Sequence, residues 1–357
     1  MNSPHPHPDL RSRPRPRPRS GFRGRRLLVL TTALVALGSG AFAAAPDPLP
    51  SPPKGLNILL VGVDSRAGVT PEERKRYYLG NKDCGCSDVM MLVHVSARND
   101  RVSVVSLPRD SLSEFPEHVD RNTGEMLAPH QAKLNAAWKE GGPSFAIEMV
   151  EAMTNVPVDR YLEIDFRRFM DTVNVVHDGV PICTDRHLKD PSTGLDLAPG
   201  TRRVLGGEAL QYVRSRKADG QADFGRIKKQ QRFVVNTLRE IRDDLFHGTA
   251  GLRRFVATLR GTQQTERGIS TSELLTLAAR LRHLSPEQTE FATVPIRTIN
   301  PLIPGVGATI SWDEEYADEV FGHLREDEGL PEPRPVPQSE TPLGEYEPYG
   351  GDSVLCP

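Results

Sequence analysis

Charged side chains stand where three expected strands begin or end. Short, nearly continuous apolar runs are typical of buried central strands. The charged residues are Asp64 and Arg66 after the run 56–63, Asp88 before the run 89–95, and Arg109 and Asp110 after the run 102–107. Loops at strand ends bind ligands in open α/β sheets, so these side chains can gather at one edge. Asp64 and Asp88 could then share Mg²⁺, with Mn²⁺ as the alternative, although any single aspartate is explained as well by a turn or helix cap.

A second cluster of charge is basic. Residues 202–232 hold nine arginines and lysines against three acids. Arg226 and Gln230 are four residues apart, so on a helix they share one face. Arg214 and Arg216 are two apart and converge on one ligand only if their helix ends near Arg214. Because guanidinium groups match phosphate oxygens in bidentate geometry, the cluster is either a phosphate site or a solvated basic face.

The two clusters together indicate polyphosphate chemistry. Phosphoryl transfer needs mainly in-line positioning of the reactants and neutralisation of charge. The sequence shows no Ser-His-Asp arrangement, no glycine-rich phosphate loop and no His-x-x-x-His zinc helix. Residue types alone therefore predict the class of chemistry without naming the substrate.

Strand and helix patterns alternate along the chain, which is typical of an α/β domain with helices on both faces of a sheet. The expected helices are 132–140, 143–153, 167–176, 206–214, 224–246, 251–260, 271–282 and 313–325. Further strands are expected at 161–166, 180–183 and 291–299. We assign residues 55–326 to one domain, in which the motifs occupy 55–245.

The net charge of −2 hides an asymmetry. Residues 1–26 contain eight arginines and one acid, which leaves 37 basic and 46 acidic residues in the rest of the chain. A body with an excess of acids argues against a nucleic-acid partner. A local basic cluster inside that body is therefore more informative about a ligand.

The N-terminal 54 residues are typical of membrane targeting. Residues 1–26 are rich in arginine and proline and should be a disordered cytoplasmic tail, and residues 27–45 carry no charge. Nineteen uncharged residues after a basic flank fit a signal-anchor that leaves the domain outside the cytoplasm. The alternative is a signal peptide, and its cleavage would leave a secreted protein. The proline-rich residues 46–54 are expected to form an extended spacer.

Two further expectations concern the cysteines and the C-terminal residues. Cys84 and Cys86 lack the spacing of a zinc site, and one of them could bridge to Cys183 in an oxidising compartment. The alternative is that these cysteines stay free or pair differently. Residues 327–357 are rich in proline, glutamate and glycine and are expected to be a disordered tail.

The ordered set of motifs resembles the LytR-CpsA-Psr family, in particular its actinobacterial members. The motifs are Gly62-Val63-Asp64-Ser65-Arg66, Ser87-Asp88, Leu107-Pro108-Arg109-Asp110, Lys133-Leu134-Asn135, Ile164-Asp165-Phe166, Arg214-x-Arg216 and Asp223-x-Gly225-Arg226-x-x-x-Gln230. The resemblance implies a three-layer α/β/α sandwich with a central mixed sheet. It also implies a magnesium-dependent phosphotransferase that moves a glycopolymer, such as a teichoic acid, from a polyprenyl pyrophosphate carrier to peptidoglycan. Its partners would be that lipid-linked polymer, peptidoglycan and membrane lipid.

The resemblance also assigns roles by position. Asp64 and Asp88 would bind the metal ion. The pyrophosphate would be bound by Arg66, Arg109, Lys133, Arg214, Arg216, Arg226 and Gln230. The residues expected to take part in catalysis are Arg109, Asp110, Arg214, Arg216 and Asp223. The roles of Asp110, Lys133, Asp165 and Asp223 are left open, because Asp110 or Asp223 could orient an arginine instead of touching substrate.

Two departures from the family pattern affect these expectations. Cys86 stands where many relatives carry an arginine, which removes one cation, and the loop 67–83 is long and polar. Apolar residues that could line a lipid tunnel are Phe145, Met149, Met153, Phe166 and Phe169, although plain core packing explains them as well. The alternative functions are a polyprenyl pyrophosphatase and a lipid-pyrophosphate-binding regulatory protein without turnover.

Overall fold

The structure is a computed structural model that describes residues 49, 52–81, 85–176, 178–246, 249–259, 265–334 and 346–357. The expected tail 1–26 and the apolar segment 27–45 lie outside these residues. Among the residues that are described, none forms a helix both long and apolar enough to cross a bilayer. The membrane anchor and its alternative, a signal peptide, stay predictions.

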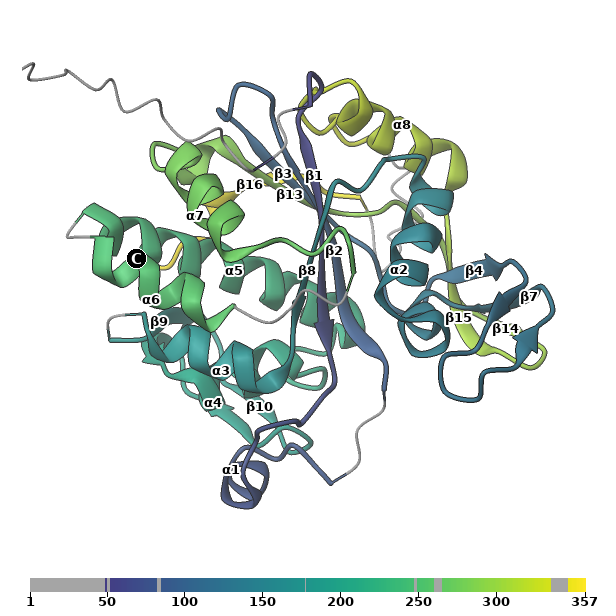
Figure 1. Ribbon diagram of the computed structural model, residues 1–357. Helices are drawn as coiled ribbons and strands as arrows, with labels where there is room; N and C mark the ends of the chain where they lie inside the picture. The colour runs from purple at the N-terminus through teal and green to yellow at the C-terminus, as the bar shows by residue number, and fades with distance from the viewer. Residues whose placement is uncertain are drawn as a thin grey trace, which may run out of the picture. The chain divides into compact units, whose positions relative to one another are not determined.

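A mixed six-stranded sheet lies at the centre of the domain, with the strand order β16-β13-β3-β2-β1-β8 (Figure 1). β8 is parallel to β1, β13 is parallel to β3, and the remaining pairs are antiparallel. The strands are β1 (Leu56–Val63), β2 (Ser87–Val95), β3 (Val102–Ser106), β8 (Arg160–Ile164), β13 (Thr289–Thr293) and β16 (Tyr349–Gly350). The expected α/β fold with a central mixed sheet is confirmed.

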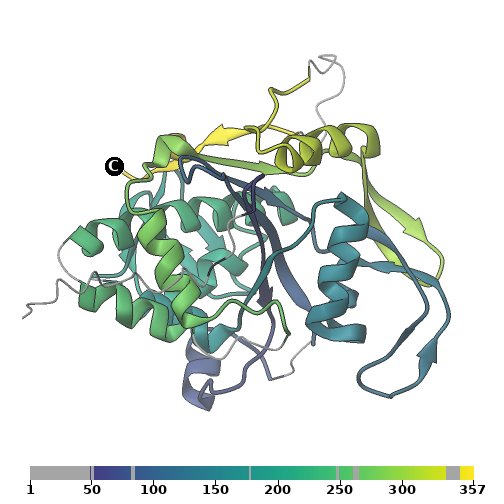
Figure 2. The same cartoon turned by 45° about the horizontal axis from the view of Figure 1, so that its top comes forward.

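Helices cover both faces of this sheet (Figures 1 and 2). In β1, Leu59 and Val61 pack into a core with α2 and α8, whereas Leu56 and Ile58 pack into a core with α5, α6 and α7. Alternate side chains of a strand point to opposite faces, so burial on both sides explains the continuous apolar run. These helices are α2 (Leu134–Thr154), α5 (Ala222–Phe246), α6 (Thr249–Thr258), α7 (Thr271–Arg280) and α8 (Glu314–Arg325).

A smaller apolar core lies beside the sheet and contains Met170, Ile182, Leu188 and Leu210. It is built from α3, α4 and two hairpins, β9–β12 and β10–β11. Their bounds are α3 (Phe166–Asn174), α4 (Gly206–Arg214), β9 (Val180–Thr184), β10 (Leu188–Asp190), β11 (Leu195–Leu197) and β12 (Gly200–Val204). The short helix α1 (Pro71–Arg76) lies between Val69 and Leu79, which join this core, whereas the 3-10 helices η1 (Pro286–Gln288) and η2 (Gly351–Val354) flank β13 and β16.

Several hairpins were not expected from the sequence. β4 pairs with β7, β5 with β6, and β14 with β15. Their bounds are β4 (Leu112–Phe115), β5 (His118–Val119), β6 (Met126–Leu127), β7 (His130–Lys133), β14 (Ile296–Ile303) and β15 (Gly307–Trp312). The single strand expected at 291–299 is wrong: β13 and β14 are separate, and Pro295 between them has no N–H for a ladder.

The expected pair of helices around Gly141 and Gly142 is one helix, α2, with a sharp kink. Gly142 has φ of 79°, a conformation that breaks the helical geometry and that glycine adopts without strain. The helix begins at Leu134, because Ala132 already belongs to β7. The predicted break is therefore confirmed, and the predicted start was two residues early.

The prediction of a disordered tail is wrong for residues 327–334, where Asp327 pairs with His94 and Arg101, and for residues 346–357. β16 pairs with β13, and Tyr346 and Cys356 are buried. Cys183 forms its disulfide with Cys356, with a Cα–Cα distance of 5.4 Å. The expected bridge from Cys183 to Cys84 or Cys86 is therefore wrong. Residues 327–357 as a whole are rich in proline and glutamate, and this composition conceals the few buried side chains of the segment, such as Tyr346.

Candidate functional site

The site lies at the edge of the sheet where β1 and β3 end and β2 begins. β2 runs antiparallel to both neighbours, so Asp64, Asp88 and Arg109 come to the same edge. The backbone N–H of Asp64 donates to the carbonyl of Cys86 at 3.0 Å, which holds the two acidic segments together. The strand order therefore brings the segments with Asp64, Asp88 and Arg109 together, as predicted.

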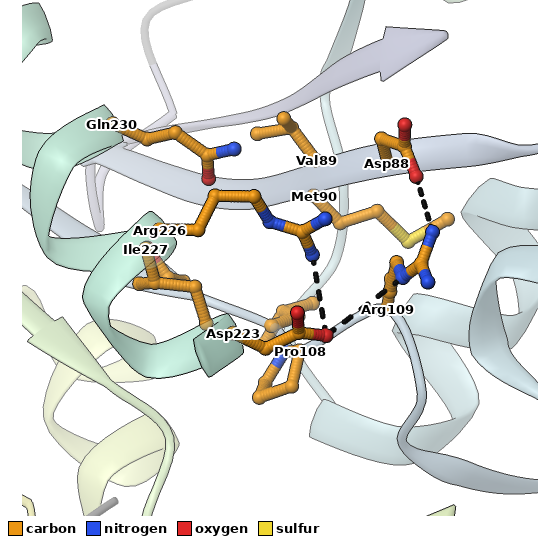
Figure 3. Close-up of a pocket in the computed structure, with 11 residues that line it drawn as sticks. Asp88, Val89, Met90, Pro108, Arg109, Asp223, Arg226, Ile227 and Gln230 are labelled. Atoms are coloured by element: carbon orange, nitrogen blue, oxygen red, sulfur yellow. Dashed lines mark hydrogen bonds and ion pairs between the residues drawn. The ribbon is translucent and has the colours of Figure 1, made fainter. Parts of the chain in front are cut away.

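Arg109 links three carboxylates, of which Asp88 and Asp223 are drawn in Figure 3. Its Nη1 donates to Asp88 Oδ1 at 2.5 Å, and its Nε lies 3.6 Å from Asp110 Oδ2 and 3.9 Å from Asp223 Oδ2. Burial would lower the pKa of Arg109, but the Asp88 and Asp110 carboxylates outweigh it and raise that pKa. Nε is buried and makes no hydrogen bond within the described part of the chain. Arg109 is therefore a permanent cation that keeps a donor for a ligand.

Asp223, in the first turn of α5, orients further arginines. Its Oδ1 lies 2.9 Å from Arg216 Nε, and its Oδ2 lies 3.5 Å from Arg226 Nη2, of which the second pair is drawn in Figure 3. Arg226 is only 4% exposed, and burial lowers its pKa to about 10. It stays protonated at neutral pH. This arrangement favours the orienting role for Asp223 that the sequence left open.

Arg214 is the last residue of α4 and is the least compensated cation of the site. In the described residues it has no carboxylate within ion-pair distance, and its buried Nη1 has no hydrogen-bond partner. Its guanidinium lies over the ring of Phe166, 5.0 Å from the centroid. Burial lowers the pKa of Arg214, and the Asp64 and Asp88 carboxylates partly oppose that effect. A buried cation without a partner is costly, and a bound anion would remove that cost.

Asp64 and Arg66 form a largely buried pair, with Arg66 Nη1 2.5 Å from Asp64 Oδ1. Arg66 Nε also donates to the carbonyl of Leu79 at 2.6 Å, so the long loop after β1 helps to hold it. Burial raises the pKa of Asp64, Arg66 lowers it, and Asp88 raises it again. A cation near both carboxylates would relieve the repulsion between them.

The residues of the site fit a magnesium ion that takes few ligands from the protein. No group of three or more histidines, cysteines or carboxylates suited to a metal occurs in the described residues. Mg²⁺ often takes one or two carboxylates and completes its shell with water and substrate phosphate. The arginine partners of Asp64 and Asp88 each bind Oδ1, which leaves Oδ2 of both for a cation.

Asp110 and Lys133 form the other flank of the site. Lys133 Nζ lies 3.2 Å from Asp110 Oδ1, and both side chains are partly exposed. Lys133 sits directly before α2, whose Asn135 donates its backbone N–H to the carbonyl of Arg109 at 3.0 Å. The Asp110 carbonyl accepts from the N–H of Ile310 in β15 at 2.9 Å. The loop 107–111 is thus fixed from two sides.

Gln230 and Arg226 lie on the same face of α5, as their spacing predicts, and line a small pocket with Asp88, Arg109 and Asp223 (Figure 3). The pocket encloses about 10 Å³, room for one water molecule. Gln230 Nε2 donates to the carbonyl of Val213 at 3.1 Å, which ties α5 to α4. Gln230 is therefore partly a structural link.

The site as a whole has more cations than carboxylates. The cations are Arg66, Arg109, Lys133, Arg214, Arg216 and Arg226, and the carboxylates are Asp64, Asp88, Asp110 and Asp223. The surplus of two positive charges suits a polyanion such as a pyrophosphate. Within the described residues, charge neutralisation and orientation are what this arrangement can supply.

Several other predicted residues have different surroundings. Asp165 is the N-cap of α3: it accepts from the N–H of Arg168 at 2.8 Å and also pairs with that side chain. Phe145, Met149 and Met153 pack in the core under α2, whereas Phe166 and Phe169 belong to the smaller core. These five residues do not line one shared tunnel. Cys86 is disulfide-bonded, so this position supplies no cation.

Comparison with known proteins decides the family. Residues 44–325 match the sequence profile of the LytR_cpsA_psr family. This chain belongs to the LytR_cpsA_psr family. The probable cell wall biosynthesis protein LcpB of Corynebacterium glutamicum is 31% identical over 276 residues, which are 76% of this chain and 61% of LcpB. TagU of Bacillus anthracis, a polyisoprenyl-teichoic acid–peptidoglycan teichoic acid transferase, is 29% identical over 185 residues, 52% of each chain.

Solved structures of similar fold agree with this membership. TagV of Bacillus subtilis matches with a TM-score of 0.57 and 22% identity, over 78% of this chain and 99% of TagV. A LytR-Csp2A-Psr enzyme from Actinomyces oris matches with a TM-score of 0.56 and 19% identity, over 76% and 90%. At this identity the likeness concerns the fold. The chain spans between 52% and 61% of the length of the curated relatives that it matches.

Proposed function

We propose that this protein is a phosphotransferase that moves a glycopolymer from a polyprenyl pyrophosphate carrier to peptidoglycan. Support comes from TagU, whose name states this class of transfer, and from family membership. The observation that carries the proposal is the surplus of converging cations, of which Arg214 has no carboxylate partner in the described residues. Such a site gains stability when a polyanion binds.

In the proposed reaction, a peptidoglycan hydroxyl attacks the phosphorus that carries the polymer. The new phosphodiester bond forms as the bond to the bridging oxygen breaks, and polyprenyl phosphate leaves. Arg109, Arg214 and Arg216 bind the pyrophosphate oxygens, while Asp223 fixes the orientation of Arg216. Asp110 lies beside Arg109 and is partly exposed, and in this proposal it accepts the hydroxyl proton.

Mg²⁺, or Mn²⁺ in its place, would be held by Asp64 and Asp88 and would neutralise charge on the phosphate oxygens. Arg66 keeps Asp64 oriented, and Arg226 with Gln230 supports the phosphate side from α5. Lys133 balances Asp110 and adds positive charge to the same flank.

The proposed location is the outer face of the cell membrane. Support comes from the uncharged segment 27–45 after a basic tail and from the Cys183–Cys356 disulfide, since disulfides persist in oxidising compartments. If the segment is cleaved, the protein is secreted. With the anchor retained, membrane lipid and peptidoglycan are both within its reach.

The test is release of polyprenyl phosphate from a polyprenyl pyrophosphate-linked glycan by the full chain in detergent. We expect turnover that requires added Mg²⁺, stops with chelator, and is lost in Arg109→Ala. Arg297→Ala is the matched control, because this exposed arginine pairs with Asp313 away from the site. Turnover without chelator sensitivity would overturn the metal assignment.

The fate of the polymer in the presence of peptidoglycan distinguishes the transferase from the two alternative functions. Product that appears on peptidoglycan fragments supports transfer, whereas free glycan phosphate released without transfer indicates the pyrophosphatase. Tight lipid binding without turnover indicates the regulatory protein.

A further inference from the structure

A turn between α4 and α5 decides where two arginines of the site point. Residues two apart on an α-helix point about 200° apart, so Arg214 and Arg216 could not meet one ligand within a helix. α4 ends at Arg214, and Ser215 has extended geometry with φ of −67° and ψ of 133°. The Ser215 backbone N–H and its hydroxyl both donate to the carbonyl of Tyr212, at 3.2 and 2.9 Å.

The next two backbone donors of the turn bind a carboxylate from another element. Asp190, the last residue of β10, accepts at Oδ2 from the N–H of Arg216 at 2.8 Å and of Lys217 at 3.0 Å. Its Oδ1 accepts from the N–H of Ser192 at 2.9 Å, within its own hairpin. Asp190 is 1% exposed. In a continuing helix the Arg216 N–H would bond to Tyr212 instead, so Asp190 competes with helix propagation.

The effect on the arginines is visible in their contacts. Arg214 stays at the helix end over Phe166, where Asp64 and Asp88 influence it. Arg216 leaves the helix direction and its Nε reaches Asp223 Oδ1 at 2.9 Å. Asp223 in turn lies beside Arg109 and Arg226.

We propose that Asp190 is a positioning residue of the pyrophosphate site, which ends α4 and thereby directs Arg214 and Arg216 to one ligand. Asp190 does not touch the ligand. The proposal rests on the proposed function, because it requires that these arginines bind a pyrophosphate.

The electrostatics of Asp190 agree with a charged anchor. Burial would raise the pKa of Asp190, but the N–H groups of Lys217, Arg216 and Ser192 outweigh burial and lower it. The carboxylate is therefore ionised at neutral pH. An asparagine can present one acceptor oxygen, but its amide group would then face backbone donors on the other side.

The experiment uses the full chain and the variants Asp190→Ala, Asp190→Asn, Arg216→Ala and the double variant Asp190→Ala/Arg216→Ala. The control is Asp196→Asn on β11 of the same hairpin, whose side chain is 57% exposed and pairs with His187. The measurements are binding of inorganic pyrophosphate by calorimetry, kcat and KM for the polyprenyl pyrophosphate substrate, and amide exchange at Arg216 and Lys217.

We expect Asp190→Ala to weaken pyrophosphate binding and kcat/KM by about 10- to 100-fold, with faster amide exchange at both positions. Asp190→Asn should lie between this variant and the wild type, and Asp196→Asn should match the wild type. The loss that Asp190→Ala adds to Arg216→Ala should be smaller than its loss in the wild type, because part of the effect of Asp190 acts through Arg216 and the rest through Arg214.

Losses that multiply in the double variant overturn the proposal, as does unchanged amide exchange in Asp190→Ala. If Asp190→Ala does not fold, the same comparison is made with Asp190→Asn. Wild-type protein that binds pyrophosphate but transfers no polymer contradicts the proposed function and leaves this assignment standing. Wild-type protein that binds no pyrophosphate overturns both.

Discussion

At the edge of the central sheet where β1 begins, Asp327 meets Arg101 Nη2 at 3.4 Å and His94 Nε2 at 3.0 Å, and it also accepts from the N–H of Ala97 at 3.2 Å. At the edge where β1 ends, Arg214 meets no carboxylate of the described residues within ion-pair distance. Both clusters are largely buried. They differ in whether the protein itself supplies the partners of its charges.

The difference is informative because burial of an unpaired cation lowers stability. Arg101 lacks a partner at Nε, but its Nη2 donates to the Asp327 carbonyl at 2.6 Å and is compensated there. Arg214 has only a ring contact and distant carboxylates. The first cluster is therefore explained by the fold, and the second needs a ligand to complete it.

Loss of the most connected pair at the site should have the largest effect. We expect Asp88→Ala and Arg109→Ala each to reduce turnover at least about 100-fold, because both remove preorganised charge at the phosphate position. The melting temperature should change little, since Asp88 lies at the beginning of β2, Arg109 lies in the loop after β3, and their side chains are 23% and 20% exposed. Near-normal turnover in either variant would contradict the assignment.

A matched pair of substitutions tests the contrast between the two edges. Arg214→Met should lower kcat/KM by about 10- to 100-fold and leave the melting temperature equal or higher, because it removes a buried, uncompensated cation. Arg101→Met should leave kcat/KM unchanged and cost about 1–3 kcal/mol of unfolding free energy, because Asp327 loses a partner. Thermal unfolding and steady-state kinetics of both variants measure this. Equal effects of the two variants on both quantities would remove the distinction.

The smallest expected effect concerns pH at the far edge. Burial lowers the pKa of His94 from its ordinary value of 6.5, although Asp327 opposes this shift. Below pH 6.5, His94 is therefore protonated in the unfolded chain while it is still neutral in the folded protein. The free energy of unfolding then falls as the pH drops toward the pKa of folded His94.

His94→Gln should cost about 1–2 kcal/mol at pH 7, since one buried hydrogen bond is weakened. The difference from the wild type should narrow as pH falls below 6.5, while turnover at pH 7 stays unchanged. Melting temperatures at a series of pH values measure it. A difference that widens in acid would show that His94 is charged in the folded protein.

The sequence predicted β1 and α4 with their observed ends, and it predicted which charged residues meet. The reason is local: an apolar run and a helix followed by polar residues both carry a strong periodic signal. The same reasoning missed the hairpins around residues 112–133, whose strands are short and half-exposed. It also missed Asp190, whose partners are backbone N–H groups that no residue pattern reveals.

The C-terminal residues show a further limit. Tyr349 Oη donates to Gln231 at 2.6 Å, and Gln231 Nε2 donates to Ser106 Oγ and to the Ala292 carbonyl, both at 2.9 Å. No local sequence pattern around any of these residues predicts the contact. Only the tertiary structure brings these four residues together, so composition alone classified the tail wrongly.

The loop that carries Arg109 is held by residues far along the chain. The N–H of Val294 donates to the Ser106 carbonyl at 3.1 Å, and Ile310 donates to Asp110 at 2.9 Å. More than half of the sequence separates β3 from its parallel neighbour β13. Contacts of such separation form late, because loop closure must precede them. A partly folded chain would therefore have most of its helices and no assembled site, so the ability to bind a ligand should appear among the last events of folding.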